Sequence, residues 1–232
     1  MLNLPHSSIT NALYTPQGVT FLSLKSSHLR GRGEVSIYLP ASAQGHSDLS
    51  LIMLLHGVYG SHFSWLYQAG AHTVLEKLMA EKQLGPFMLV MPSDGLTGDG
   101  SGYLEHENKN HEAWIVEDVL LAIKHHFSEI TERSRIFISG LSMGGYGALR
   151  LGIKYHQIFS GISAHSSITD LDDFQTFIEE DIRSKISEQT IHESSVVYNA
   201  LKYRDHLPPL RFDCGVEDQL IESNRSLHAL LR

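Results

Sequence analysis

The 232 residues are 42% hydrophobic and 19% charged, which is typical of a globular protein, so we expect one domain over residues 1–232. The formal net charge of −8 argues against nucleic acid as a partner, because such binding needs a basic stripe. One cysteine, Cys214, excludes an internal disulfide, and the 15 histidines show no metal-ligand spacing such as H-E-x-x-H. We therefore expect no metal and no cofactor.

Neither a leader nor a membrane anchor is predicted. Residues 1–14 lack the basic start and apolar core of a signal peptide, and no apolar run approaches the length of a membrane span. These features predict a cytoplasmic protein without a membrane partner.

Strand-like and helix-like segments alternate along the chain. Residues 19–24 and 34–39 alternate polar and apolar side chains and predict an opening antiparallel pair. Residues 51–55 are continuously apolar, as is typical of a strand buried on both faces. Similar strands are predicted over 87–91, 135–139, 159–164 and 210–214, with helices over 72–82, 112–127, 144–155, 171–186, 194–201 and 218–231.

This alternation predicts an α/β fold with a mostly parallel sheet and helices on both faces. In such sheets the functional site lies at the carboxyl ends of the strands. The loops that follow the strands are therefore the places to search for chemistry.

The segment Gly140-Leu141-Ser142-Met143-Gly144 reads G-x-S-x-G and joins a predicted strand to a predicted helix. This context is typical of a nucleophile elbow, in which glycines relieve crowding at a sharp turn. The turn would expose the Ser142 hydroxyl, and the Met143 amide would lie beside it at a helix N-terminus, where negative charge is favoured. The alternative is a glycine-rich turn without chemistry.

A second loop of interest follows the strand at 51–55 and reads His56-Gly57-Val58-Tyr59-Gly60. A glycine-containing loop after an early buried strand supplies the second oxyanion donor in such folds, and the Val58 amide is the predicted donor. We expect His56 to brace this loop rather than to act on substrate.

The catalytic acid is predicted in the loop after the late strand at 210–214. Asp218 is the candidate, and its alternative role is to cap the helix that follows it. Asp213, inside the strand, and Glu217 are the weaker alternatives.

Several motifs occur together in one order along the chain: H-G-x-x-G-S, M-P-S-D-G, G-D-G-S-G-Y, G-L-S-M-G-G-Y-G-A-L and C-G-x-E-D. Over residues 20–232 the chain thereby resembles the putative esterase family, which includes esterase D, feruloyl and acetyl-xylan esterases and the antigen 85 mycolyltransferases. The resemblance implies an α/β-hydrolase fold and Ser-Asp-His chemistry on carboxylic esters. It assigns Ser142 as nucleophile, Asp218 as acid and the Val58 and Met143 amides as the oxyanion hole, and it places the loop at 94–103 near the mouth of the site.

In this family the triad histidine follows the acid after a helix, a strand and a loop, often within G-G-H-x-W. Here only His228 follows Asp218, and about ten residues of helix would separate the two side chains by roughly 15 Å. His165, at the end of the strand at 159–164, is the candidate substitute base; its alternative role is a loop histidine bonded to backbone. His56 and His62 are weaker candidates.

The resemblance also implies that the last strand and helix of the fold are missing from this sequence. An exposed sheet edge and an uncovered apolar face would result. We expect either a shortened chain or a homo-oligomer that covers the edge.

Two functions compete at this point. The first is a serine carboxylesterase that removes acetyl, feruloyl or similar small acyl groups from a small-molecule or carbohydrate ester. The second is a non-catalytic binding module on a decayed esterase scaffold. A peptidase, a thioesterase or an acyltransferase would use the same acyl-enzyme chemistry.

Overall fold

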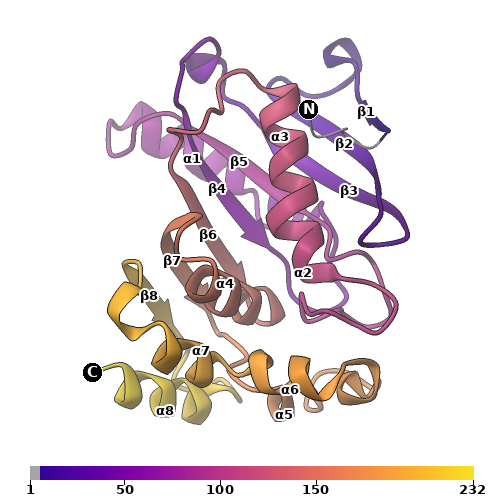
Figure 1. The fold of residues 1–232 in the computed structure, drawn as a ribbon. Helices are drawn as coiled ribbons and strands as arrows, with labels where there is room; N and C mark the ends of the chain where they lie inside the picture. Colours follow the sequence, from indigo (N-terminus) through magenta and orange to yellow (C-terminus); the bar gives the residue numbers. More distant parts are fainter. Residues whose placement is uncertain (1–5) are drawn as a thin grey trace.

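The computed structural model describes residues 6–232, which form an eight-stranded sheet in the order β1-β2-β3-β5-β4-β6-β7-β8 (Figure 1). Each neighbouring pair from β1 through β2 and β3 to β5 is antiparallel. Each neighbouring pair from β5 through β4, β6 and β7 to β8 is parallel. The predicted antiparallel opening pair and the mostly parallel sheet are confirmed. The strands are β1 Ser7–Ile9, β2 Val19–Ser26, β3 Gly31–Tyr38, β4 Ser50–Leu55, β5 Phe87–Pro92, β6 Ile136–Leu141, β7 Phe159–His165 and β8 Leu210–Asp213.

Helices follow most of the parallel strands. Their bounds are α1 Ala71–Ala80, α2 His111–Ala113, α3 Leu120–His126, α4 Met143–Lys154, α5 Leu171–Phe174, α6 Glu188–Ser194, α7 Val196–Lys202 and α8 Ile221–Leu231, and a π-helical stretch, Trp114–Val119, joins α2 to α3. Short 3₁₀ and π segments lie at Ala12–Tyr14, Ala41–Ala43, Ser64–Gln68, Ile182–Lys185 and Arg204–His206.

The prediction of one helix over 171–186 was wrong. The short helix α5 is capped by Asp170 and is followed by an irregular segment that leads to the 3₁₀ turn Ile182–Lys185. The aspartates in this stretch stop helix propagation, because their side chains bond the nearby backbone instead.

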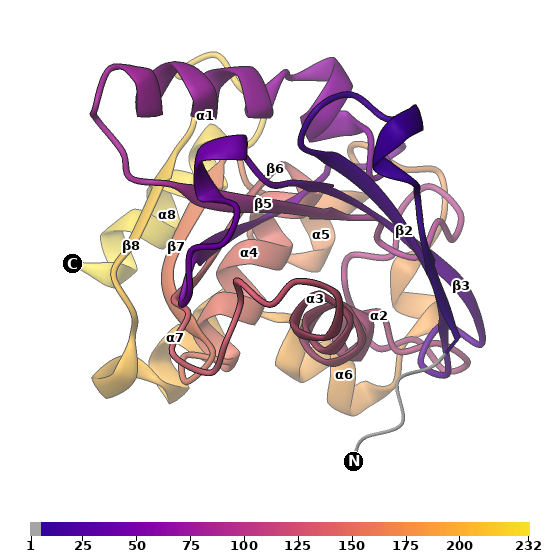
Figure 2. The ribbon, with the colours of Figure 1, turned by 90° about the horizontal axis from the view of Figure 1, so that it is seen from above.

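The parallel strands are apolar on both faces because helices cover both faces. Helix α1 lies on one side of the sheet, and α3 and α4 lie on the other (Figure 2). Along β4, Leu51, Met53 and Leu55 belong to the core cluster that includes residues of α3 and α4, whereas Leu54 packs in the cluster with Leu75 of α1. Because successive side chains of a strand point to opposite faces, β4 contributes to the hydrophobic core on each side of the sheet.

Strands β4, β6 and β7 are neighbours, so their carboxyl ends converge at one edge of the sheet. Leu55 pairs with Gly140, and Leu141 pairs with His165. The loop after β4, the turn after β6 and the end of β7 therefore lie together.

Strands β1 and β8 form the two edges of the sheet within residues 6–232. The homo-oligomer that would cover an edge stays a prediction. In the same part of the chain, no helix combines the length and apolar character needed to cross a bilayer.

Candidate active site

Ser142 occupies the turn between β6 and α4 with φ 57° and ψ −117°. A positive φ is strained for a residue with a side chain and is typical of functional turns. Gly140 and Gly144 make the turn possible: a Cβ on Gly140 would overlap the Gly144 carbonyl, and one on Gly144 would overlap the Leu55 carbonyl. Ser142 itself is half-buried, so its hydroxyl is not enclosed in the packed interior.

The loop after β4 lies directly against this serine. A Cβ built on Gly57 would stand 3.5 Å from the Ser142 Cβ and 4.0 Å from its Oγ, which is van der Waals contact, so the loop packs directly on the serine side chain. Within residues 6–232, the amides of Val58 and Met143 donate to no other group of the chain. Two unpaired amides beside one hydroxyl are what an oxyanion hole requires.

His56 braces this loop. Its Nδ1 lies 2.7 Å from the Gly57 carbonyl oxygen, and its Nε2 accepts a hydrogen bond of 3.0 Å from the Asp94 amide. The residue is only 3% exposed, and both ring nitrogens lie within hydrogen-bond distance of backbone groups. The predicted bracing role agrees with these contacts.

The loop at 94–103 lies against the same two segments, the turn at Ser142 and the loop after β4. Asp94 is buried and its carboxylate accepts from the amides of Leu96 and Ser101, which closes the loop on itself. A Cβ on Gly100 would meet the Met143 sulfur at 2.5 Å and the Val58 side chain at 3.5 Å. The loop therefore packs onto both predicted oxyanion residues.

A series of buried polar contacts joins the loop after β4 to helix α4, and the sequence analysis missed it. The Tyr103 hydroxyl donates to the His56 carbonyl at 2.9 Å, and the Tyr103 carbonyl accepts from the Arg150 guanidinium at 2.5 Å. Arg150, on α4, is fully buried and pairs with Glu112. One arginine on the elbow helix thereby also holds the loop that carries Val58.

In this set of buried contacts, the charges of Glu112 and Arg150 are paired with each other. Burial raises the pKa of Glu112, but Arg150 and Lys154 outweigh it and hold that pKa at about 2. Lys154 lies 2.8 Å from the Glu112 carboxylate, and the Tyr155 hydroxyl donates to it at 2.5 Å. An arginine within an otherwise apolar helix was the signal in the sequence, because a buried cation needs an anionic partner.

The acid and base residues are less closely organised. Asp218 lies in the turn before α8, and its Oδ1 accepts from the Leu220 amide at 2.9 Å. This contact is an Asx turn ahead of the helix. The N-cap of α8 is Leu220, with no side-chain cap, so the capping role given above as the alternative for Asp218 was wrong. Within residues 6–232 no histidine forms a hydrogen bond or ion pair with Asp218, and His228 on α8 lies against Phe212 with the ring centroids 6.2 Å apart.

His165 and Asp213 form a pair instead. The His165 Nδ1 lies 3.0 Å from the Asp213 Oδ2, and Arg211 bonds the same oxygen at 2.8 Å. Burial raises the pKa of Asp213, but the bonds from His165 and Arg211 outweigh it, so the pKa lies below its ordinary value. This pairing follows from the register, since His165 and Asp213 are partners across β7 and β8.

His165 contacts the elbow through its backbone, and its imidazole is not hydrogen-bonded to Ser142. Its backbone carbonyl accepts from the Ser142 amide at 2.9 Å, while its Nε2 lies 3.3 Å from the Ser163 hydroxyl. The structure thus brings Ser142, Val58, Met143 and the backbone of His165 together. It leaves Asp218 apart from any histidine in the described residues.

No cluster of three or more histidine, cysteine, aspartate or glutamate side chains able to hold a metal ion occurs in the described part of the chain.

Comparison with known proteins gives a consistent result. The model of a family described as "Putative esterase" matches residues 26–220. An acetyl esterase from Caldicellulosiruptor saccharolyticus is 29% identical over 203 residues, which are 80% of this chain and 72% of the relative.

Solved structures share the fold. A ferulic acid esterase superposes with a TM-score of 0.79 at 21% identity, covering 99% of this chain and 86% of the other. The Staphylococcus aureus fluorophosphonate-binding serine hydrolase FphF gives a TM-score of 0.75 at 22% identity and covers 94% and 86%. The predicted α/β fold is confirmed.

Proposed function

Because the chain belongs to the putative esterase family, we propose that it is a serine carboxylesterase whose nucleophile is Ser142. The observation that carries the proposal is the half-buried Ser142 at positive φ with two unpaired amides beside it. Family membership and the acetyl esterase relative support hydrolysis of carboxylic esters in general. The serine mechanism rests on the geometry described above.

The reaction begins with attack of the Ser142 Oγ on the ester carbonyl carbon. The carbonyl oxygen gains negative charge as its π bond breaks, and the Val58 and Met143 amides stabilise it in place of water. The N-terminal end of the 12-residue helix α4 adds a favourable field at the same point. Collapse of the intermediate expels the alcohol and leaves an acyl group on Ser142, which water then releases as the carboxylic acid.

The base in this chain is proposed to be His165, with Asp213 as its carboxylate partner. His165 takes the Ser142 hydroxyl proton and returns it to the leaving alcohol, and Asp213 stabilises the imidazolium. Rotation about the His165 side-chain bonds is needed, because its Nε2 lies 3.3 Å from the Ser163 hydroxyl. Asp218, predicted as the acid, would serve only a histidine other than His165.

The acyl group is proposed to be small, such as acetyl, with feruloyl as the larger candidate. The acetyl esterase relative and the ferulic acid esterase neighbour motivate these two choices.

The deciding experiment is labelling of the folded chain with a fluorophosphonate probe, followed by peptide mass spectrometry. We expect labelling at Ser142, its loss in Ser142→Ala, and full labelling in the control Ser128→Ala, which changes an exposed serine. Hydrolysis of 4-nitrophenyl acetate, measured in parallel, should fall by about 10⁴-fold or more in Ser142→Ala. Unlabelled Ser142 in folded protein at alkaline pH would contradict the proposal.

The second candidate function is a binding module on an esterase scaffold. The observation in its favour is that no histidine side chain in residues 6–232 is hydrogen-bonded to Ser142 Oγ. Hydrolysis that is lost in Ser142→Ala favours the esterase, whereas folded protein without hydrolysis or labelling favours the binding module. His165→Ala then tests the base alone: lost hydrolysis supports the assignment, and unchanged hydrolysis rejects it.

A further inference from the structure

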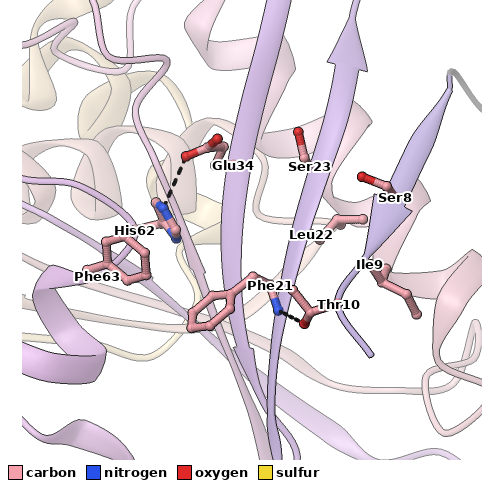
Figure 3. Close-up of a pocket in the computed structure, with 9 residues that line it drawn as sticks. All are labelled: Ser8, Ile9, Thr10, Phe21, Leu22, Ser23, Glu34, His62 and Phe63. Atoms are coloured by element: carbon pink, nitrogen blue, oxygen red, sulfur yellow. Dashed lines mark hydrogen bonds and ion pairs between the residues drawn. The ribbon is translucent and has the colours of Figure 1, made fainter. Parts of the chain in front are cut away.

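A cavity of about 320 Å³ lies beside β1, β2 and β3, and Figure 3 shows the residues that line it. Ligand pockets in proteins begin at about this size. The lining residues come from the three strands and from the loop after β4; they are Ser8, Ile9, Thr10, Phe21, Leu22, Ser23, Glu34, His62 and Phe63. None of them belongs to the proposed esterase site.

The polar side of the cavity is a row across three strands. Ser8 pairs with Ser23, and Ser23 pairs with Glu34, so their side chains project side by side, as Figure 3 shows. The two hydroxyls form no hydrogen bond with other groups in residues 6–232, and the Glu34 side chain is 47% exposed. The row thus offers two groups that donate or accept and one carboxylate that only accepts.

His62 holds the carboxylate in place without cancelling its charge. Its Nε2 lies 3.2 Å from Glu34 and its Nδ1 lies 2.8 Å from the Ser36 hydroxyl, so the neutral ring donates to one partner and accepts from the other. Burial lowers the pKa of His62 more than Glu34 raises it, which keeps the ring neutral at neutral pH. The carboxylate therefore repels anions and is matched by O–H donors.

The other side of the cavity is aromatic. Phe21 and Phe63 meet edge to face with centroids 5.4 Å apart, and Phe63 is 41% exposed. Tyr67 extends this surface, 5.9 Å from Phe63 and 51% exposed. Exposed rings that lie beside hydroxyl and carboxylate acceptors suit a ligand with apolar C–H faces and many hydroxyl groups.

The position of the cavity relates it to the nucleophile. The Ser93 amide, just after β5, donates to the Glu34 carbonyl, and the Glu34 amide donates to the Ser93 hydroxyl, so the row lies toward the carboxyl ends of the parallel strands. Strand β3 is three strand steps from β6 in the order β3-β5-β4-β6, which is about 14 Å at the usual strand spacing. An acetyl group does not span this distance, but an oligomeric alcohol does.

We propose that this cavity binds a neutral oligosaccharide, through C–H contacts on Phe21 and Phe63 and hydroxyl contacts on Ser8, Ser23 and Glu34. The role of this cavity as a subsite for the alcohol half of the ester rests on the proposed function. The binding of an oligosaccharide to the cavity does not. Acidic saccharides are excluded by Glu34 and by the net charge of −8.

The test is titration of the full chain carrying Ser142→Ala with xylotetraose and with cellotetraose, followed by calorimetry and by NMR. This background has no nucleophile, so binding is read without chemistry and failure of the esterase proposal leaves the titration unchanged. We expect saturable binding of at least one tetraose, weakened about tenfold by Phe63→Ala and by Glu34→Gln. The matched controls Tyr14→Ala and Glu222→Gln change an exposed ring and an exposed carboxylate outside the cavity and should bind as the parent does.

Two outcomes would overturn the inference. One is the absence of binding of both tetraoses to folded protein, checked by thermal unfolding. The other is a change in neither variant or a preference for a cation: the tetraose affinity is the same in Phe63→Ala and Glu34→Gln as in the parent, or the charged aromatic probe benzyltrimethylammonium binds more tightly than the tetraoses.

Discussion

The two halves of the proposed esterase site are built differently. The half that carries Val58 and Met143 is supported by buried groups: His56, Tyr103 and Arg150 are each at most 3% exposed. The half that carries His165 and Asp213 is open, with side-chain exposures of 33% and 53%. Preorganised amides need a rigid support to stabilise an anion, whereas a general base must come within hydrogen-bond reach of the hydroxyl that it deprotonates.

The comparison also explains where stability is at stake. Removing one member of a buried charged network leaves its partner desolvated and unpaired, whereas an exposed ion pair contributes little. The oxyanion half should therefore respond to mutation through stability and kcat together, and the open half through activity alone. The following predictions test this contrast.

The largest expected effect on stability is that of Arg150→Met. It leaves Glu112 buried without its main partner, at a cost of about 3–5 kcal/mol in the free energy of unfolding, measured by urea denaturation. The double variant Arg150→Met/Glu112→Gln should recover part of the loss, because no unpaired charge remains. Equal stability of the single and double variants would show that the charge is not the cause.

Acid should weaken the same half of the site. The pKa of Glu112 is about 2 in the folded chain, against an ordinary value of 4.5 when unfolded, because Arg150 and Lys154 outweigh its burial. A depressed folded-state pKa gives stability that is present above about pH 4.5 and is lost as the pH falls toward 2. Denaturation midpoints measured across this window should show a shallower decline in Glu112→Gln than in the parent.

A smaller effect is expected for Tyr103→Phe. The substitution removes only the hydroxyl that donates to the His56 carbonyl, so we expect a loss of about 1–3 kcal/mol of stability. Since the Val58 amide is then less firmly placed, kcat for 4-nitrophenyl acetate should fall about tenfold with little change in KM. A rise in KM with unchanged kcat would assign Tyr103 to substrate binding instead.

The smallest stability effect should come from Asp213→Asn. An exposed ion pair is worth less than about 1 kcal/mol, so the unfolding midpoint should hardly move. Hydrolysis should nonetheless fall steeply if His165 is the base, because the imidazolium loses its carboxylate. Asp218→Asn is the matched variant, and a larger loss of activity there would return the acid role to Asp218.

The elements with a strong local signal were predictable. The period-two pattern of β2 and β3, the apolar run of β4 and the glycine-flanked turn at Ser142 all agree with the structure. The helix predicted over 171–186 failed because aspartate side chains compete for the backbone, an effect that hydrophobic spacing does not report. The three-residue edge strand β1 was missed because so short a segment has no period to detect.

The site divides in the same way. Ser142, Met143 and Val58 are close in space because each directly follows a buried strand and those strands are neighbours, and the order of strand, turn and helix is written in local residue types. The pairing of His165 with Asp213 and the contact of Tyr103 with both Arg150 and His56 join residues 47 or 48 positions apart. Such contacts depend on strand register and on burial, which only the packed tertiary structure sets, because the cost of an unpaired buried charge arises only after water has been removed.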